Sequence, residues 1–303
     1  MSLQMRRFVT LIQKGLSDLS QLLLELLSLR KGQSRVYTER AVLKRTLADR
    51  IPRRSWDSHM HVVDPVEYPL AEGALYTPKP HRLSQALRFE ASTGIRNIVL
   101  VQPSIYRTDN SCLLDALRTL GPRHGRAVVA FDCDTIDALT LEKWHGWGVR
   151  GVRVNTQSIG KHMGEDELAT TLRRHANIIR PYNWVLQLYV PLATAVVLER
   201  IVPELGLRVC LDHFGAPDLL DASHNGDPYN LSGFRSLVNL LRQGTTYVKL
   251  SAPYRISSDW PHTRFEGFDI KPYMEALLNW CGDEALVERV FKGNAEALRG
   301  IQP

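Results

Sequence analysis

Two histidines one position apart, His59 and His61, are the side chains whose spacing most clearly suggests shared chemistry. Side chains alternate between the faces of a β-strand, so these two imidazoles point the same way, about 7 Å apart along the strand. Two imidazoles on one face can hold a metal ion or a substrate. Their neighbours are apolar, which predicts a buried strand. The alternative is a short strand that carries two histidines by chance, and the surrounding elements bear on that choice.

Those elements alternate regularly from Trp56 onward. Continuous apolar runs are typical of strands buried on both faces, and strand-then-helix alternation predicts a parallel sheet. Seven strands in sequence, counting the first, favour a closed TIM-type (β/α)8 barrel of the α/β class over an open sheet. The later runs cover 97–104, 127–133, 148–155, 184–190, 208–215 and 246–251, and helical patterns cover 81–92, 111–120, 136–144, 166–179, 192–205 and 231–242.

Polar residues stand at the ends of these predicted strands, where such barrels gather their chemistry. The sixth strand ends in Asp212-His213-Phe214-Gly215. A buried polar group costs free energy unless it finds a partner, so several at matching strand ends predict a shared pocket. Arg153 and Arg255 could each hold a carboxylate through two hydrogen bonds, or form surface ion pairs instead. The candidate substrate-binding residues are Gln102, Arg153, Gln187, Tyr189, Tyr254 and Arg255.

The segment Asp57-Ser58-His59-Met60-His61 resembles the first-strand signature of the amidohydrolase superfamily. The resemblance is to the amidohydrolase-related branch that contains the 2-pyrone-4,6-dicarboxylate lactonases, and it runs from about residue 56 to about residue 300. It implies a site histidine on the sixth strand, which is His213. It also implies a general base at the end of strand eight, because Ser258-Asp259-Trp260-Pro261-His262 matches the family segment whose aspartate activates water; the base would be Asp259.

The resemblance implies a hydrolase that acts on a small carboxylated substrate with a lactone-like C–O bond. His59, His61 and His213 would polarise the carbonyl, directly or through a metal, and Asp259 would activate water. With Asp259 they would also form a plausible zinc site, although lactonase-like members of the family work without metal. An arginine replaces the fourth-strand lysine of binuclear members. Two alternatives are a zinc-dependent decarboxylase of aromatic or enoic acids, and an inactive remnant.

Only three residues separate Arg255 from Asp259. A crossover between parallel strands, helix included, needs about 10–12 residues. The sequence therefore predicts a barrel that lacks the seventh helix and most of the eighth strand. Such a barrel would leave strand edges uncovered. Two more helical patterns follow, at 270–280 and 283–298.

Charge divides the 303 residues into two parts. Residues 1–54 carry 12 Lys and Arg and 4 Asp and Glu, a net charge of +8. The whole chain has a net charge of +6, so residues 55–303 carry the remaining −2. Residues 1–54 are predicted to form a basic helix at 4–32 and a linker, and the barrel domain covers 55–303. Because the excess positive charge lies outside the barrel, we expect no nucleic-acid binding by it, and no apolar run is long enough for a membrane span.

The four cysteines are scattered without a Cys-x-x-Cys pair, which favours a reducing, intracellular compartment. We therefore expect a cytoplasmic protein. A mitochondrial location is the weaker alternative, because acidic residues interrupt the basic N-terminal helix. The oligomeric state stays open.

Overall fold

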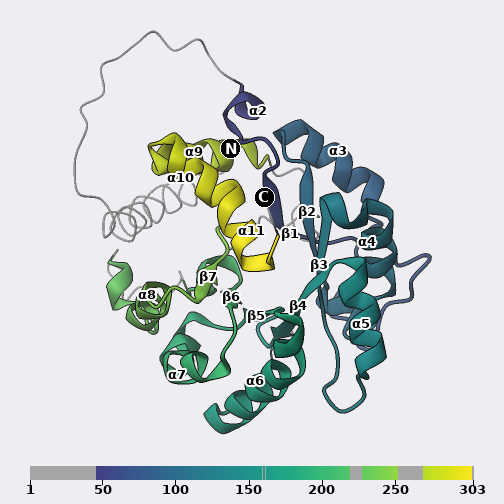
Figure 1. The fold of residues 1–303 in the computed structure, drawn as a ribbon, viewed down its shortest axis with the longest axis vertical. Helices are drawn as coiled ribbons and strands as arrows, with labels where there is room; N and C mark the ends of the chain where they lie inside the picture. Colours follow the sequence, from purple (N-terminus) through teal and green to yellow (C-terminus); the bar gives the residue numbers. More distant parts are fainter. Residues whose placement is uncertain (1–45, 159, 161, 219–226, 252–268, 302–303) are drawn as a thin grey trace.

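The computed structural model describes residues 46–158, 160, 162–218, 227–251 and 269–301, and these contain a seven-stranded parallel sheet (Figure 1). Each strand pairs with the next in sequence, so the order is β1 to β7, and the sheet curls in the manner of a TIM-type barrel. This confirms the predicted strands. They are β1 (Trp56–Met60), β2 (Asn97–Val101), β3 (Gly125–Val129), β4 (Val149–Asn155), β5 (Val185–Tyr189), β6 (Val209–Leu211) and β7 (Thr246–Val248).

Helices follow the strands in alternation and cover the outer face of the sheet, as Figure 1 shows. The six outer helices are α3 (Leu83–Thr93), α4 (Ser111–His124), α5 (Ala138–Trp147), α6 (Glu165–Ile179), α7 (Ala195–Ile201) and α8 (Phe234–Arg242). The other helices are α2 (Leu47–Arg50), α9 (Lys271–Cys281), α10 (Glu284–Glu288) and α11 (Asn294–Arg299). Short 3₁₀ turns lie at η1 (Ser104–Tyr106), η2 (Arg180–Tyr182), η3 (Leu192–Thr194), η4 (Val202–Leu205), η5 (His213–Gly215) and η7 (Pro228–Asn230). None of these described helices is long and apolar enough to cross a membrane.

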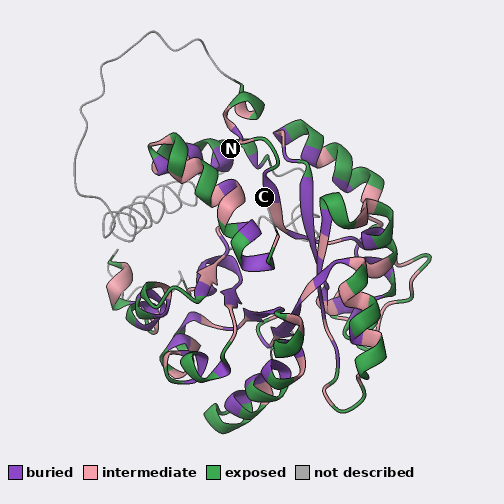
Figure 2. Ribbon diagram, in the orientation of Figure 1, coloured by how far each residue is buried: buried purple, intermediate pink, exposed green. Residues whose placement is uncertain are grey.

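Strands β2 to β6 are largely buried on both faces, as their continuous apolar runs predict (Figure 2), whereas the edge strand β7 is half-buried at Tyr247 and Val248. On the outer face, side chains such as Leu100 and Leu186 pack against the helices in the main hydrophobic core. On the inner face, Val99 and Val128 pack against Ala295 of α11. The last helix therefore fills the concave side of the sheet and takes part in the core there.

The inner face changes from apolar to polar along the strands. On β5, Val185 packs with Leu298 of α11, whereas Gln187, two residues later, bonds to Asp212. The same change from an apolar to a polar side chain occurs at β6, where Cys210 packs with Leu298 and Asp212, two residues later on the same face, is polar. The carboxyl ends of the strands thus carry the polar site, and α11 fills the opposite end.

The predicted helix over 283–298 is in fact interrupted. A five-residue π-helical segment, η8 (Arg289–Gly293), separates α10 from α11. Such segments are often found at functional sites. Within the described residues β7 and β1 are not paired, and the expected loss of a helix and a strand falls at 252–268, outside the described residues. That expectation stays a prediction.

The described chain begins with a segment that packs on the domain. Arg50 at the end of α2 donates to Asn279 Oδ1 of α9 at 2.7 Å, and Ile51 is buried in a cluster with residues of α9. The predicted helix at 4–32 lies outside the described residues, and the division at 54/55 stays a prediction.

Two glycines with the same backbone angle provide a stability test. Gly233 and Gly244 both have φ +83°, but a Cβ at 233 would lie 2.0 Å from Leu192 O, whereas a Cβ at 244 would meet nothing within 4 Å. We expect Gly244→Ala to cost about 1–2 kcal/mol, the left-handed backbone penalty alone. Gly233→Ala should cost roughly 1–3 kcal/mol more, because backbone must move. Urea unfolding of both variants would measure this, and equal losses would contradict the close approach.

Candidate active site

A single buried carboxylate, Asp212, lies at the centre of the polar inner face, directly after β6. It is 1% exposed, and its backbone N–H donates to Leu188 O at 2.9 Å. Arg153 of β4 contacts its Oδ2 through both Nε, at 3.1 Å, and Nη2, at 3.0 Å. Gln187 Nε2 donates to the same oxygen at 3.2 Å. Three adjacent strands therefore fix the position of this carboxylate.

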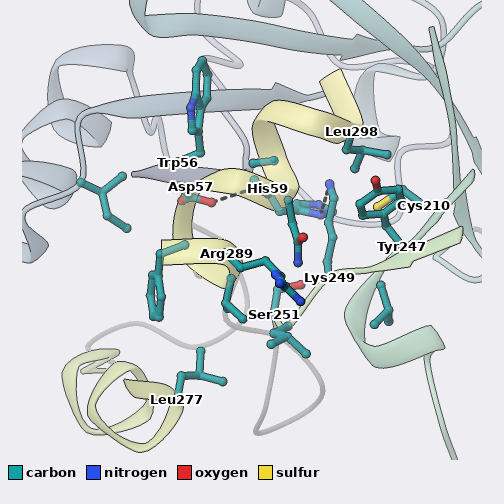
Figure 3. A pocket seen from close by; sticks show the side chains of 18 of the residues that line it. Trp56, Asp57, His59, Cys210, Tyr247, Lys249, Ser251, Leu277, Arg289 and Leu298 are labelled. Carbon is teal, nitrogen blue, oxygen red and sulfur yellow. Dashed lines mark hydrogen bonds between the residues drawn. The ribbon is translucent and has the colours of Figure 1, made fainter. Parts of the chain in front are cut away.

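The other oxygen of Asp212 faces Lys249 and His59. Lys249 Nζ lies 3.4 Å from Oδ1, and His59 Nδ1 lies 3.3 Å from it. Lys249 Nζ and His59 Nδ1 are 3.2 Å apart, as the dashed line in Figure 3 marks. Side chains from the two edge strands of the described sheet, β1 and β7, thus contact the same carboxylate, although these strands are not hydrogen-bonded to each other.

Burial and these neighbours act in opposite directions on the acid. Burial raises the pKa of Asp212, but Lys249, His59 and Arg153 together hold that pKa well below 3.8. Burial also lowers the pKa of Lys249 below 10.5, and the facing Asp212 limits the fall. The site at neutral pH therefore contains an ionised carboxylate and a lysine that gives up its proton more readily than usual.

The three predicted histidines gather at this centre. The ring centroids of His59 and His61 are 5.0 Å apart, and those of His59 and His213 are 4.7 Å apart. A bulge in β1 between Asp57 and Met60 shifts the register at this point. His61 Nδ1 lies 2.7 Å from Val101 O, and His213 Nδ1 lies 2.8 Å from Ser251 Oγ.

His213 stands in an unusual turn. Four consecutive residues have positive φ: His213 at 50°, Phe214 at 57°, Gly215 at 79° and Ala216 at 52°. For a residue other than glycine this conformation costs about 1–2 kcal/mol. Backbone hydrogen bonds hold it, including Phe214 N–H to Lys249 O at 2.9 Å. Strained backbone next to Asp212 is a pattern often found at active sites.

The remaining predicted residues divide into three kinds. Tyr189 packs edge-on against His213, with the Arg153 guanidinium 5.4 Å from its ring centre. Gln102 instead holds its own loop, with Nε2 donating to Arg107 O and Asp109 O, and its backbone carbonyl accepts from Arg153 Nη1 at 3.1 Å. Tyr254, Arg255 and Asp259 lie outside the described residues, so their roles stay predictions.

Two central residues, Asp212 and Lys249, were not among the sequence candidates. Both stand in the strand-end segments that the sequence indicates, one position before His213 and at the end of β7. The sequence signal that could have identified Lys249 as a site residue was its position, a lysine directly after the strand β7. Its meaning depends on a carboxylate 37 positions earlier, which only the folded sheet brings into contact.

The last helix also reaches this network. Arg299 of α11 is 1% exposed, and its Nη2 donates to Gln187 Oε1 at 3.0 Å. Gln187 in turn donates to Asp212. Gly151 leaves room for this guanidinium, because a Cβ there would lie 2.9 Å from Arg299 Nη1. A buried polar chain thus links the inner helix to the active-site carboxylate.

The ligand atoms of His59, Asp212 and His213 lie within 4.8 Å of one another, a spacing that could hold a metal ion. Their chemical types suit zinc. The local charge does not, because Arg153 and Lys249 already contact Asp212 and would repel a divalent cation placed beside it. The predicted ligand set also differs, since His61 faces a backbone carbonyl and Asp259 lies outside the described residues.

This arrangement can stabilise negative charge that develops on a substrate. Fixed donors in a buried site stabilise an oxyanion strongly, because they need no reorganisation during the reaction. The Lys249 ammonium and the His59 ring can act as such donors, and Asp212 contacts both of them. The geometry suits attack of water on a carbonyl carbon.

Comparison with known proteins gives consistent matches. The family model for the amidohydrolases matches residues 56–287. A 4-sulfomuconolactone hydrolase of Hydrogenophaga intermedia is 28% identical over 238 residues, which is 78% of this chain and 74% of the relative. A Pseudomonas putida structure named as a 2-pyrone-4,6-dicarboxylic acid hydrolase has a TM-score of 0.67 and 27% identity, and the match covers 84% of this chain and all of that one.

A more distant solved structure shares the fold alone. It is an amidohydrolase of Burkholderia multivorans with bound zinc, 16% identical, with a TM-score of 0.63 and coverage of 82% of this chain and 99% of that chain.

Proposed function

Because this chain belongs to the amidohydrolase family and is a hydrolase, we propose that it opens the ring ester of a small carboxylated lactone. The names of its relatives suggest two such substrates, 4-sulfomuconolactone and 2-pyrone-4,6-dicarboxylate. Both names denote a lactone ring that also carries acid groups. They make hydrolysis a better supported reaction than decarboxylation.

The observation that carries this proposal is the buried Asp212 with its three partners, Arg153, Lys249 and His59. Two of the three partners, Arg153 and Lys249, are basic side chains at the carboxyl ends of the strands. A substrate with acid groups is attracted to cations in a site that excludes water. The same groups then stabilise the oxyanion.

In the proposed reaction, water adds to the lactone carbonyl and the ring C–O bond breaks, giving a carboxylate and a hydroxyl group. Lys249 and His59 donate to the carbonyl oxygen as it gains charge. Asp212 orients both donors and balances their charge. We propose Asp259 as the base that takes a proton from water, on the match of residues 258–262 to the family segment.

The test is ring opening of the two candidate lactones, followed by loss of their ultraviolet absorbance. Turnover of either by the full chain would support the proposal. Product identification by mass spectrometry would separate the addition of water from the loss of CO₂, and a decarboxylated product would overturn it.

We also propose that catalysis does not need a divalent metal, because Lys249 provides positive charge beside Asp212. We expect kcat after dialysis against EDTA to stay within about twofold of its value before dialysis. Loss of a catalytic metal would instead remove several kcal/mol of transition-state stabilisation and lower kcat much further. Metal analysis of the dialysed protein is the control. Activity that is lost on dialysis and restored by zinc would contradict the proposal.

A further inference from the structure

A cavity of about 790 Å³ lies between the two edge strands, β1 and β7. Four consecutive residues of the first segment, from Trp56 to His59, and six of the second, from Thr246 to Ser251, line it. Successive residues of a strand point to opposite faces, so consecutive lining residues mean that the cavity runs along the strand edges. One part of it reaches His59 and Lys249 of the active site (Figure 3).

The wall opposite these strands is apolar. It is formed by residues of α3, α9 and η8, which cluster into a second hydrophobic core. The lining side chains include Phe89, Met274, Leu277 and Phe291. A volume of this size and an apolar wall with few polar groups are typical of sites for small organic ligands.

Two polar side chains in this cavity point to a ligand. Arg289 of η8 is exposed, and its side chain makes no hydrogen bond or ion pair with the other described residues. Its side chain extends toward Ser251 in Figure 3. Glu90 of α3 is only 2% exposed and its carboxyl group interacts with Asp57, but within the described structure its Oε2 has no partner at hydrogen-bond geometry. Buried polar atoms are normally paired, so an unpaired one facing a cavity suggests a ligand group.

The acidic Asp57 also lines the cavity, but three basic residues, Arg242, Lys249 and Arg289, outnumber it and suit an anion. Burial, and then the charge of nearby Asp57, raises the pKa of Glu90 well above 4.5, which favours the neutral form of this acid. The guanidinium of Arg289 can bind a carboxylate through two hydrogen bonds. An apolar wall beside a cation is the arrangement that recognises an amphipathic carboxylate.

We propose that this cavity holds the apolar substituent of the substrate, a carboxylated lactone that bears a hydrophobic chain. The inference rests on the proposed function and narrows its substrate class. The ring lies at His59 and Lys249, Arg289 binds an acid group near Ser251, and the chain packs against Met274 and Leu277. The unpaired oxygen of Glu90 accepts a hydrogen bond from a hydroxyl group on that chain.

Binding of decanoate to the full chain, measured by calorimetry, tests the site without turnover. We expect decanoate to bind and butyrate not to bind. Arg289→Gln should weaken decanoate binding at least tenfold, about 1.4 kcal/mol, whereas Lys292→Gln should leave it unchanged. Lys292 is a matched control because it lies three positions away, outside the cavity, paired with Glu288.

A second pair of variants tests the apolar wall. Leu277→Trp should fill the cavity and weaken decanoate at least tenfold, whereas Leu87→Trp, at an exposed position of α3, should not. Thermal melts would show that both variants fold. Absence of decanoate binding, or binding that neither Arg289→Gln nor Leu277→Trp weakens, would overturn the inference. Because binding is measured alone, failure to hydrolyse the test lactones would overturn only the proposed function.

Discussion

Asp212→Ala should unfold this protein more easily and abolish most of its activity. The change leaves Arg153 and Lys249 buried without the carboxylate that both of them contact. Removal of one partner from a buried ion pair costs about 3–5 kcal/mol. The oxyanion donors also lose their support, so kcat/KM should fall by roughly 10²–10³ or more. Urea unfolding at pH 7 and lactone hydrolysis measure the two effects.

The controls for Asp212 separate charge from shape. Asp212→Asn keeps an oxygen that can accept from Gln187 and removes only the charge. Combined with Lys249→Met, it should be more stable than Asp212→Asn alone, because one uncompensated cation is gone. The folded pKa of Asp212 is lowered, so the stability it contributes is present above about pH 4 and is lost as pH falls below that value. An Asp212→Ala protein within 1 kcal/mol of wild type would contradict this account.

Lys249→Met should reduce kcat/KM by roughly 10²–10³ with a smaller effect on stability. The ammonium is lost from beside the carbonyl site, but Arg153 still compensates Asp212. Wild type should lose activity on the alkaline side with an apparent pKa below 10.5, because burial lowers the pKa of Lys249. Lys249→Arg, if active at all, should lack this alkaline loss, since arginine keeps its proton.

The same lysine links stability to pH. Its folded pKa is lowered, so between that value and about 10.4 the unfolded chain binds the extra proton. Wild-type stability should therefore rise with pH across this range relative to Lys249→Met. Urea unfolding at several pH values measures the difference, and parallel curves for the two proteins would contradict burial of a titrating lysine.

The sheet could be predicted because its signal repeats along the chain. Strands such as Asn97–Val101 and Val185–Tyr189 are continuously apolar, which periodicity alone detects. His59, Arg153 and Gln187 could be predicted as site residues for the same reason, since each is a polar exception in a buried strand. Their proximity then follows from parallel strands that end at one edge.

Other features depend on contacts that a pattern cannot show. One is the burial of His175 on α6, whose ring stacks on that of Phe131 with the two centroids 5.5 Å apart. The helical pattern near residue 298 indicates an apolar face but not that this face fills the inside of the sheet. Lysine is rarely buried, so the role of Lys249 is visible only once Asp212 lies beside it.

The position of α11 has a consequence for biosynthesis. Arg299 bonds to Gln187, 112 positions earlier, and Ala295 and Leu298 cover the inner faces of β2, β3, β5 and β6. Chains emerge from the ribosome N-terminus first, so the strands are made while this apolar surface is still uncovered. Translation must pass residue 299 before the sheet is filled and Asp212 is fully held. Until then the nascent chain exposes a concave hydrophobic surface, which is the kind of surface that chaperones bind.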